Sequence, residues 1–175
     1  MSKIKTLPKN VIVGYTTSKA DTAKSLQKVT QAIQNGVNVV IWSFIQLTKT
    51  TSSQMTEETT SKVSTTKLTL KPIIRGGPDL QKLEIYIKKL HQMGYDDTVH
   101  LAAFGGWNGP HLDTSFSAEE MYEAWKEYNV NGVLDGFDWD LEGEDNVQGP
   151  NNVFALDVLE RMGEMSRLAK QGTEC

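Results

Sequence analysis

One ten-residue segment, Leu134–Gly143, constrains the fold of this chain more than any other. Bulky apolar residues alternate in it with acids, in the order Leu-Asp-Gly-Phe-Asp-Trp-Asp-Leu-Glu-Gly. Because successive side chains of a strand point to opposite faces, a strand over Val133–Leu141 places Asp138, Asp140 and Glu142 on one face. Three neighbouring carboxylates cannot all ionise at low cost inside a protein. The pattern therefore predicts a strand whose acidic face performs chemistry.

Two other interpretations fit the same acids. Asp138, Asp140, Glu142 and Gly143 match the first, third, fifth and sixth positions of an EF-hand calcium loop. The bidentate glutamate that such a loop needs at its last position is replaced by Gly149. The apolar flanks also suit a buried strand better than a helix that enters a loop. A solvated acidic edge strand is the second alternative, and a catalytic site is favoured over both.

Composition excludes two classes of partner. The net charge of -4 provides no basic field to attract nucleic acid or an anionic membrane. No apolar stretch approaches the length of a membrane span, and the run Val11–Tyr15 is too short for the core of a signal peptide. The single cysteine, Cys175, cannot form an intramolecular disulfide. We therefore expect no nucleic acid and no membrane among the partners, and these features alone are typical of a cytosolic protein.

Strand and helix signals alternate along the chain. The patterns predict strands over Val11–Thr16, Val37–Leu47, Thr98–Phe104 and Val133–Leu141, and helices over about Ala20–Asn35, from Pro78 to a stop at Gly94, from a capping box at Ser117 to about Tyr128, and from about Asn152 onward. Repeated βα units predict a parallel sheet. A (β/α)8 TIM-type barrel needs roughly 250 residues. We therefore expect one α/β domain over residues 1–175, with about the first four βα units of such a barrel, a half barrel.

A Ser/Thr-rich segment, Thr48–Lys67, interrupts this alternation. Twelve of its twenty residues are Ser or Thr, and its only apolar residues are Met55 and Val63. Since so few apolar residues cannot pack, the composition predicts a mobile loop insertion, followed by an extra strand over Leu68–Arg75. Loops after barrel strands lie on the active-site face, so the insertion either forms a wall of a cleft or has no role.

Three motifs resemble glycoside hydrolase family 18, the chitinase and endo-N-acetylglucosaminidase family. Asp135-x-x-Asp138-x-Asp140-x-Glu142 is similar to the DxxDxDxE signature of that family. The run Ala-Phe-Gly-Gly-Trp that begins at Ala103 resembles the SxGG(W) motif at the end of the third barrel strand. The run Val11–Tyr15, which ends in Gly-Tyr, resembles the first barrel strand of the family. One departure is Ala103 itself, because the motif has a serine there and a hydroxyl under the catalytic strand is missing. The family's landmarks on the sixth and eighth strands are not present in these 175 residues.

The resemblance implies a substrate-assisted retaining mechanism. Glu142 would protonate the glycosidic oxygen while the 2-acetamido carbonyl of the substrate attacks the anomeric carbon. Asp140 would hydrogen-bond the acetamide nitrogen and stabilise the resulting cation, and Asp138 would share a proton with Asp140. At least one pKa must rise among three adjacent acids, as a general acid near neutrality requires. Asp135 is out of phase with the other acids and is interpreted as a structural residue that fixes the strand entry.

The candidate substrate contacts are Trp107, Gly106 and Tyr15. Trp107 follows two glycines at a strand end, where its ring could stack on the apolar face of a pyranose. The parity of Trp139 and the helical spacing of Trp125 predict packing roles instead. No cofactor and no metal are expected, because the three histidines lack metal-ligand spacing.

The expected partner is a polysaccharide or oligosaccharide that contains N-acetylglucosamine. A carbohydrate-binding protein without turnover is the alternative function, although binding-only relatives typically lack the glutamate found at position 142. The two open strand edges of a half barrel also favour self-association. Members of the family are often secreted, whereas no signal peptide is expected in this chain, so the localisation stays open.

Overall fold

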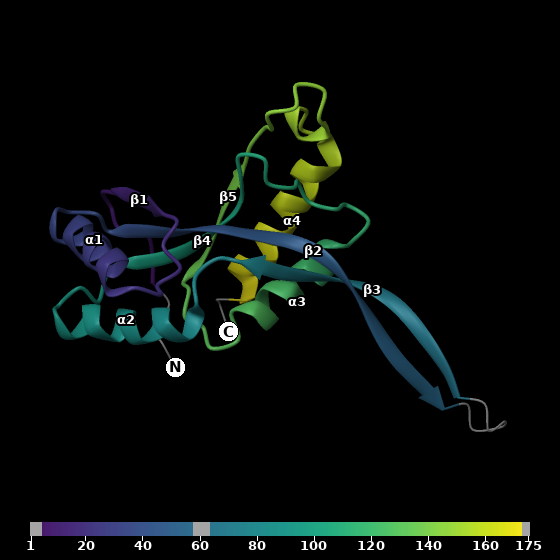
Figure 1. The fold of residues 1–175 in the computed structure, drawn as a ribbon, viewed down its shortest axis with the longest axis horizontal. Coiled ribbons are helices and arrows are strands. Elements are labelled where there is room, and N and C mark those ends of the chain that lie inside the picture. Colours follow the sequence, from purple (N-terminus) through teal and green to yellow (C-terminus); the bar gives the residue numbers. More distant parts are fainter. Residues whose placement is uncertain (1–4, 58–63, 173–175) are drawn as a thin grey trace.

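Strands and helices alternate along the chain in the computed structural model, which describes residues 5–57 and 64–172, apart from the side chains of 53–57 and 64–67 (Figure 1). In chain order the elements are β1 (Val13–Thr16), α1 (Ala23–Gln34), β2 (Val39–Glu57), β3 (Ser64–Gly76), α2 (Leu80–Gln92), β4 (Val99–Gly106), α3 (Ala118–Tyr128), β5 (Gly136–Leu141), the short 3₁₀ helix η1 (Pro150–Asn152) and α4 (Leu156–Gly172). Within the described ranges, no helix is both long and apolar enough to cross a membrane.

The parallel part of the sheet has the strand order β1-β2-β4-β5, and β3 pairs with β2 in the antiparallel direction. This parallel sheet is curled into a half barrel within a mixed α/β fold. The prediction of four parallel strands joined through helices is therefore confirmed. β1 and β5 are the outer strands of this order, and each has a paired neighbour on one side only among the described residues.

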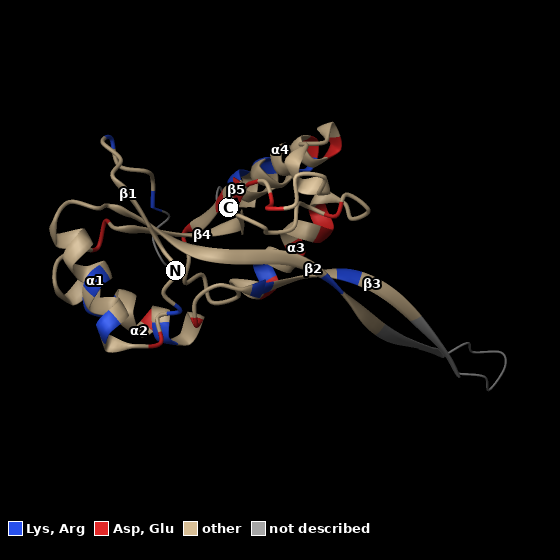
Figure 2. Cartoon of the chain, turned by 45° about the horizontal axis from the view of Figure 1, so that its top comes forward, with Lys and Arg blue, Asp and Glu red and all other residues tan. Residues whose placement is uncertain are grey.

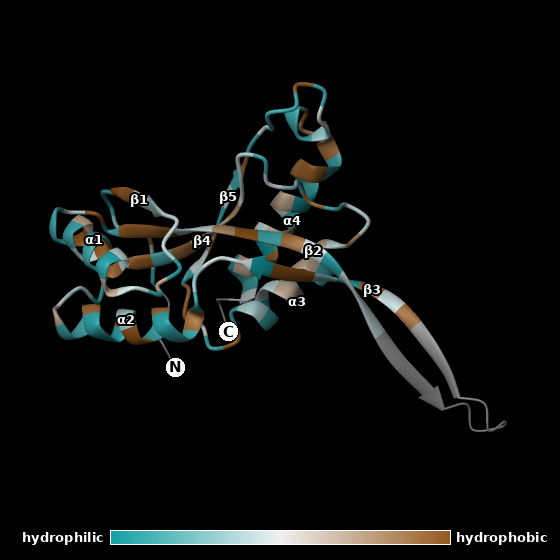
Figure 3. Cartoon of the chain, in the orientation of Figure 1, coloured by the Kyte–Doolittle hydropathy of each residue, from teal (hydrophilic) through white to brown (hydrophobic). Residues whose placement is uncertain are grey.

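The two faces of the curled sheet are packed by different residues. The main core lies between one sheet face and the helices, and there Trp42, Phe104 and Leu83 are almost completely buried. The residues that alternate with them on β2 and β4 form a second, smaller cluster on the opposite face, which consists of Val39, Ile41, Val99 and Ala103. Apolar colour accordingly covers the first part of β2, before the arm, and much of β4 in Figure 3. A near-continuous apolar run, as predicted over Val37–Leu47, is what a strand buried on both faces requires.

Side-chain caps determine where the helices begin. The capping box predicted at Ser117 is present, with Ser117 and Glu120 bonded reciprocally through side chain and backbone. The helix expected from Pro78 begins later, because the Asp79 carboxylate accepts the first free backbone N–H groups and so serves as the N-cap. The last helix likewise begins at Leu156 rather than near residue 152, where the separate turn η1 forms.

The prediction of a loop over Thr48–Lys67 is wrong for residues 48–57 and 64–67. These residues extend β2 and β3, which pair continuously from Ile45 opposite Gly76 to Glu57 opposite Ser64. Threonine favours strands, and the ladder satisfies the backbone polar groups without an apolar core. The resulting two-stranded arm projects away from the helices (Figure 1). The remaining residues of the predicted loop, 58–63, lie outside the described ranges, and the extra strand predicted over Leu68–Arg75 is confirmed as part of β3.

Asp135 connects the start of β5 to β4. Its Oδ2 accepts a hydrogen bond from the backbone N–H of His100 at 2.8 Å, and its own N–H donates to the carbonyl of His100 at 2.8 Å. The ammonium group of Lys5 lies 3.7 Å from the same carboxylate. Such contacts are expected of a structural residue at the strand entry, which is the role that the sequence predicts for Asp135.

We predict that Asp135→Ala lowers the free energy of unfolding by about 1–3 kcal/mol, because it leaves the N–H of His100 without an acceptor. Urea unfolding followed by circular dichroism measures this difference. Asp96→Ala is the matched control, since Asp96 is exposed and its closest cation, His91, is 3.9 Å away. Equal stability of the two variants would contradict the structural role of Asp135.

Candidate active site

The acidic residues of β5 face away from the helices. In the sheet register Asp138 lies beside Ala103 of β4, and Asp140 lies beside Gly105. Glu142 follows the end of β5 in the same phase, and all three side chains belong to half-buried residues. Because their neighbours on β4 are so small, the carboxylates stand over a strip of sheet with little side chain. Figure 2 shows acidic residues at β5 and on the adjacent helices α3 and α4.

The opposite face of β5 is aromatic and anchors the strand to the core. The ring of Trp139 stacks on Phe104 with centroids 5.1 Å apart, and its Nε1 donates to Ser166 Oγ of α4 at 2.9 Å. Phe137 meets Phe104 edge-on at 5.6 Å. The predicted packing role of Trp139 is confirmed, as is that of Trp125, which is buried in the main core. Packing of this face fixes the acidic side chains on the other one.

Tyr15 reaches from the first strand to the last. Its hydroxyl donates a hydrogen bond to Asp138 Oδ2 at 2.9 Å. In a flat sheet the three strand spacings between β1 and β5 would separate them by roughly 14 Å, so the hydrogen bond depends on the curl of the sheet. Burial, this hydrogen bond and repulsion by the nearby acids raise the pKa of Tyr15 to about 12. The phenol therefore stays protonated and remains a donor at any physiological pH.

The pKa of the Asp140 carboxyl is raised above its ordinary value. Burial is the largest cause, followed by repulsion from Glu142 and then Asp138 and by a side-chain hydrogen bond with Glu142. The sequence predicted that at least one acid of the row would titrate at higher pH, and Asp140 is the one. In this structure the carboxyl of Asp140 is bonded to Glu142, while Asp138 accepts its bond from Tyr15.

The glycines at the end of β4 allow the close approach of neighbouring groups. Gly105 has φ +105°, and a Cβ there would overlap the carbonyl oxygen of Asp140. Gly106 has φ +84°, and its Cβ would lie 2.8 Å from the ring of Phe44. The Phe44 ring thus covers Gly106, so that this predicted substrate contact is buried. Phe44 lies within the apolar run Val37–Leu47 that predicts a buried strand, and no sequence signal distinguishes it from the other apolar residues of that run.

Two loops at the carboxyl ends of β4 and β5 border the acidic row. Trp107 is 56% exposed in the first loop, and its Nε1 donates to Asp145 of the second loop at 2.7 Å. His111 Nε2 lies 2.8 Å from the carbonyl oxygen of Glu142, which holds the first loop against the end of β5. No sequence signal marks His111 or Asp145 as a site residue, because neither belongs to a periodic pattern.

The calcium-loop interpretation is wrong, because Asp138 and Asp140 lie inside a paired strand rather than in a loop between helices. Within residues 5–57 and 64–172, no group of three or more acidic, histidine or cysteine side chains is arranged to hold a metal ion.

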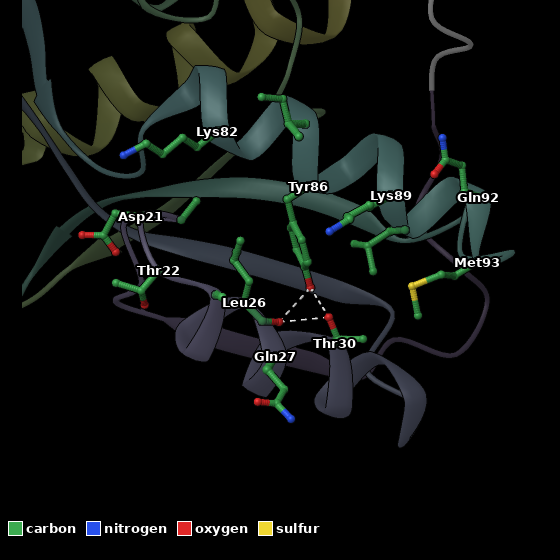
Figure 4. Close-up of a pocket in the computed structure, with 14 residues that line it drawn as sticks. Asp21, Thr22, Leu26, Gln27, Thr30, Lys82, Tyr86, Lys89, Gln92 and Met93 are labelled. Atoms are coloured by element: carbon green, nitrogen blue, oxygen red, sulfur yellow. Dashed lines mark hydrogen bonds between the residues drawn. The ribbon is translucent and has the colours of Figure 1, made fainter.

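A cavity of about 640 Å³ lies between α1 and α2, away from the carboxylates (Figure 4). Its walls include Leu26, Ile85 and Met93. The Tyr86 hydroxyl donates to the carbonyl oxygen of Leu26 at 3.3 Å and lies 2.9 Å from Thr30 Oγ1. The hydroxyls of Tyr86 and Thr30 are therefore already hydrogen-bonded within the protein.

The raised pKa of Asp140 predicts a dependence of stability on pH. Since the folded chain holds the Asp140 proton to a higher pH than the unfolded chain, this group makes the fold less stable as the pH rises through its raised pKa. Asp140→Asn should therefore raise the melting temperature relative to the wild type at pH 7, and the gain should shrink at pH 3. Thermal unfolding at both pH values tests this, and a gain that is the same at both would refute the assignment.

Comparisons with known proteins add no relative: no family model, no curated protein and no solved structure matches the chain. A function for this chain is therefore inferred from the geometry of the site and from the motifs of the sequence.

Proposed function

We propose that this chain is a chitinase-like glycoside hydrolase of the family 18 type, which cleaves β-1,4 bonds of N-acetylglucosamine polymers or oligomers. On this proposal the curled sheet corresponds to the first half of a (β/α)8 barrel. Active sites of such barrels lie at the carboxyl ends of the strands, where Glu142 and the loop of Trp107 are found. The observation that carries the proposal is the row of three half-buried carboxylates on one face of β5, with Tyr15 bonded to its first member.

Glu142 is the proposed acid and base. It lies at the mouth of the sheet, and it would donate its proton to the glycosidic oxygen as the bond to the anomeric carbon breaks. The carbonyl oxygen of the substrate's own acetamide attacks that carbon and forms an oxazolinium ion. Water then opens the ring and returns a proton to Glu142. The intramolecular nucleophile gives this route an effective-molarity advantage on the order of several kcal/mol.

Asp140 is the proposed partner of the acetamide group. As a carboxylate it would accept the acetamide N–H and offset the positive charge that develops on the ring. The side-chain hydrogen bond with Glu142 that contributes to the raised pKa of Asp140 links the two carboxyl groups before substrate binds. Substrate entry would transfer this hydrogen bond from Glu142 to the acetamide, which frees Glu142 to protonate the leaving oxygen.

Asp138 and Tyr15 are the proposed supporting residues for Asp140. Asp138 is the acid next to Asp140 on the same face, and it contributes to the electrostatic repulsion that raises the pKa of Asp140. The hydrogen bond from Tyr15 fixes the carboxylate of Asp138 in place. Since Tyr15 is 53% exposed, its ring also borders the open side of the sheet, where it can contact a ligand.

A carbohydrate-binding protein without turnover is the second candidate. The open face of the curled sheet favours it: Val13 and Tyr15 of β1 are 45% and 53% exposed there, and Tyr15 already donates a hydrogen bond to Asp138 across that face. Binding needs only a platform and a few hydrogen bonds, whereas catalysis needs groups that stabilise the transition state more than the bound substrate.

Release of a fluorophore from a chito-oligosaccharide glycoside separates the two candidates. We predict that the wild-type chain cleaves the substrate and that Glu142→Gln lowers the rate by roughly 10²-fold or more, since the amide cannot donate the proton. Glu160→Gln is the charge-matched control, because Glu160 is exposed on α4.

The outcome assigns the function. Cleavage by the wild type and by Glu160→Gln, but not by Glu142→Gln, supports the hydrolase. Binding of the oligosaccharide by all three folded chains without any cleavage would reject the hydrolase in favour of the binding protein.

A further inference from the structure

We infer that Asp145 and Asn108 are positioning residues that hold the Trp107 indole as a stacking platform for a pyranose ring beside Glu142. This inference rests on the proposed saccharide ligand and adds to it the residues that orient the platform. Three observations in the loops support the inference: a reciprocal hydrogen-bonded pair, the packing of the indole against a glycine, and the exposure of the ring.

The reciprocal pair links the loop after β4 to the loop after β5. Asn108 Nδ2 donates to Asp145 Oδ2 at 2.8 Å, and the backbone N–H of Asp145 donates to Asn108 Oδ1 at 2.8 Å. The backbone N–H of Asn108 also donates to the carbonyl of Gly143 at 3.0 Å. Asn108 makes these bonds with φ +61°, a left-handed conformation that asparagine and aspartate adopt more readily than other side chains. The Asn108–Asp145 pair is thus a specific junction of two loops.

The second oxygen of Asp145 fixes the indole. Asp145 Oδ1 accepts from Trp107 Nε1 at 2.7 Å, so that one carboxylate bonds both the tryptophan and Asn108. These two hydrogen bonds lower the pKa of the Asp145 carboxyl below its ordinary value, with the bond from Trp107 as the larger cause. The carboxylate is therefore present as an acceptor throughout the neutral and mildly acidic range.

Packing restricts the remaining rotation of the ring. A Cβ at Gly143 would lie 3.4 Å from Cζ3 and 3.5 Å from Cη2 of Trp107, so the six-membered ring lies against the backbone of this glycine. Gly143 is the residue directly after Glu142. The hydrogen bond at one end of the indole and the glycine at the other hold the ring next to the proposed acid.

The exposed face of the indole defines the ligand class. Trp107 is 56% exposed even though its only polar atom is already bonded to Asp145, so the free surface is the apolar ring. A flat apolar surface beside carboxylates suits a ligand with an apolar face and a polar edge, and a pyranose has both. An indole that is held in advance loses less conformational entropy when it binds than a freely rotating one.

A reciprocal exchange of the two side chains tests the inference. Asn108→Asp alone places two carboxylates against each other, and Asp145→Asn alone places two amide groups there. The double exchange, Asn108→Asp with Asp145→Asn, reverses the bond between the two side chains and leaves an acceptor for the backbone N–H of residue 145 and for Trp107 Nε1, so that all three hydrogen bonds can form. The probe is tri-N-acetylchitotriose, whose binding is measured by calorimetry while the indole N–H resonance of Trp107 is followed by ¹⁵N NMR without sugar.

Each single exchange should weaken chitotriose binding about five- to tenfold and shift the indole resonance, and the double exchange should restore both. Trp107→Phe, which keeps a ring but has no N–H, should weaken binding to a similar degree. Asp113→Asn is the matched control: Asp113 lies in the loop after β4, and its carboxylate accepts from Ser115 of that loop and from Lys49 of β2. It should leave both readouts unchanged.

Single exchanges that bind chitotriose as tightly as the wild type would overturn the inference, as would a double exchange that restores the indole resonance but not binding. Hydrolysis is a separate outcome. If binding follows the exchange pattern and no variant cleaves, the platform stands and the proposed hydrolase falls. If Glu142→Gln abolishes cleavage while the exchanges leave binding unchanged, the hydrolase stands and the platform is rejected.

Discussion

The alternation of side chains along β5 is the constraint on which the rest of the structure depends. Phe137 and Trp139 must be buried against Phe104 and α4 for the strand to join the sheet, and this packing commits the residues between them to the opposite face. Shifting the register by one residue would bury two or three acids in an aromatic core, at a cost far above the stability of an ordinary domain. The acidic row is therefore fixed by packing on the other side of the sheet.

Three features make the row tolerable. Its residues are half-buried and not fully buried, so water still solvates part of each carboxylate. One of the acids, Asp140, keeps its proton more readily than usual and so reduces the charge of the row. Tyr15 supplies a neutral donor that cannot be lost to ionisation below a pH of about 12. The first strand thus stabilises the last one, and the curl of the sheet becomes part of the electrostatics of the site.

The local parts of this arrangement were predictable, and the long-range parts were not. The period of two along β5 predicted its acidic face, and the capping box at Ser117 predicted the start of α3, because both signals lie within a few residues. The bond from Tyr15 to Asp138 depends on sheet curvature, which no local pattern contains. The low apolar content of Thr48–Lys67 predicts a loop because it leaves no core to pack, whereas backbone hydrogen bonds pair β2 with β3 in the arm. Asn108 and Asp145 lie in loops, where a side-chain hydrogen bond leaves no periodic trace.

The open edge of β5 connects self-association with the chemistry of the acids. A cleft of about 530 Å³ lies at the first half of β5, with residues of α3, α4 and the segment before β1, such as Tyr122, Ser166 and Leu7, among its lining residues. Any strand that added to β5, from a second copy or from further chain, would remove water from the face that holds Asp138 and Asp140. Burial is already the largest cause of the raised pKa of Asp140, so closure of the edge would raise that pKa further. Asp140 would then keep its proton to a higher pH, so that less of the carboxylate form would be present at neutral pH. On the proposed mechanism a neutral Asp140 does not offset the positive charge that develops on the sugar ring, so covering this edge would weaken transition-state stabilisation more than ground-state binding. Self-association, which remains a prediction for this chain, would therefore affect turnover more than affinity, whereas the platform of Trp107 at the loops would set affinity in either state.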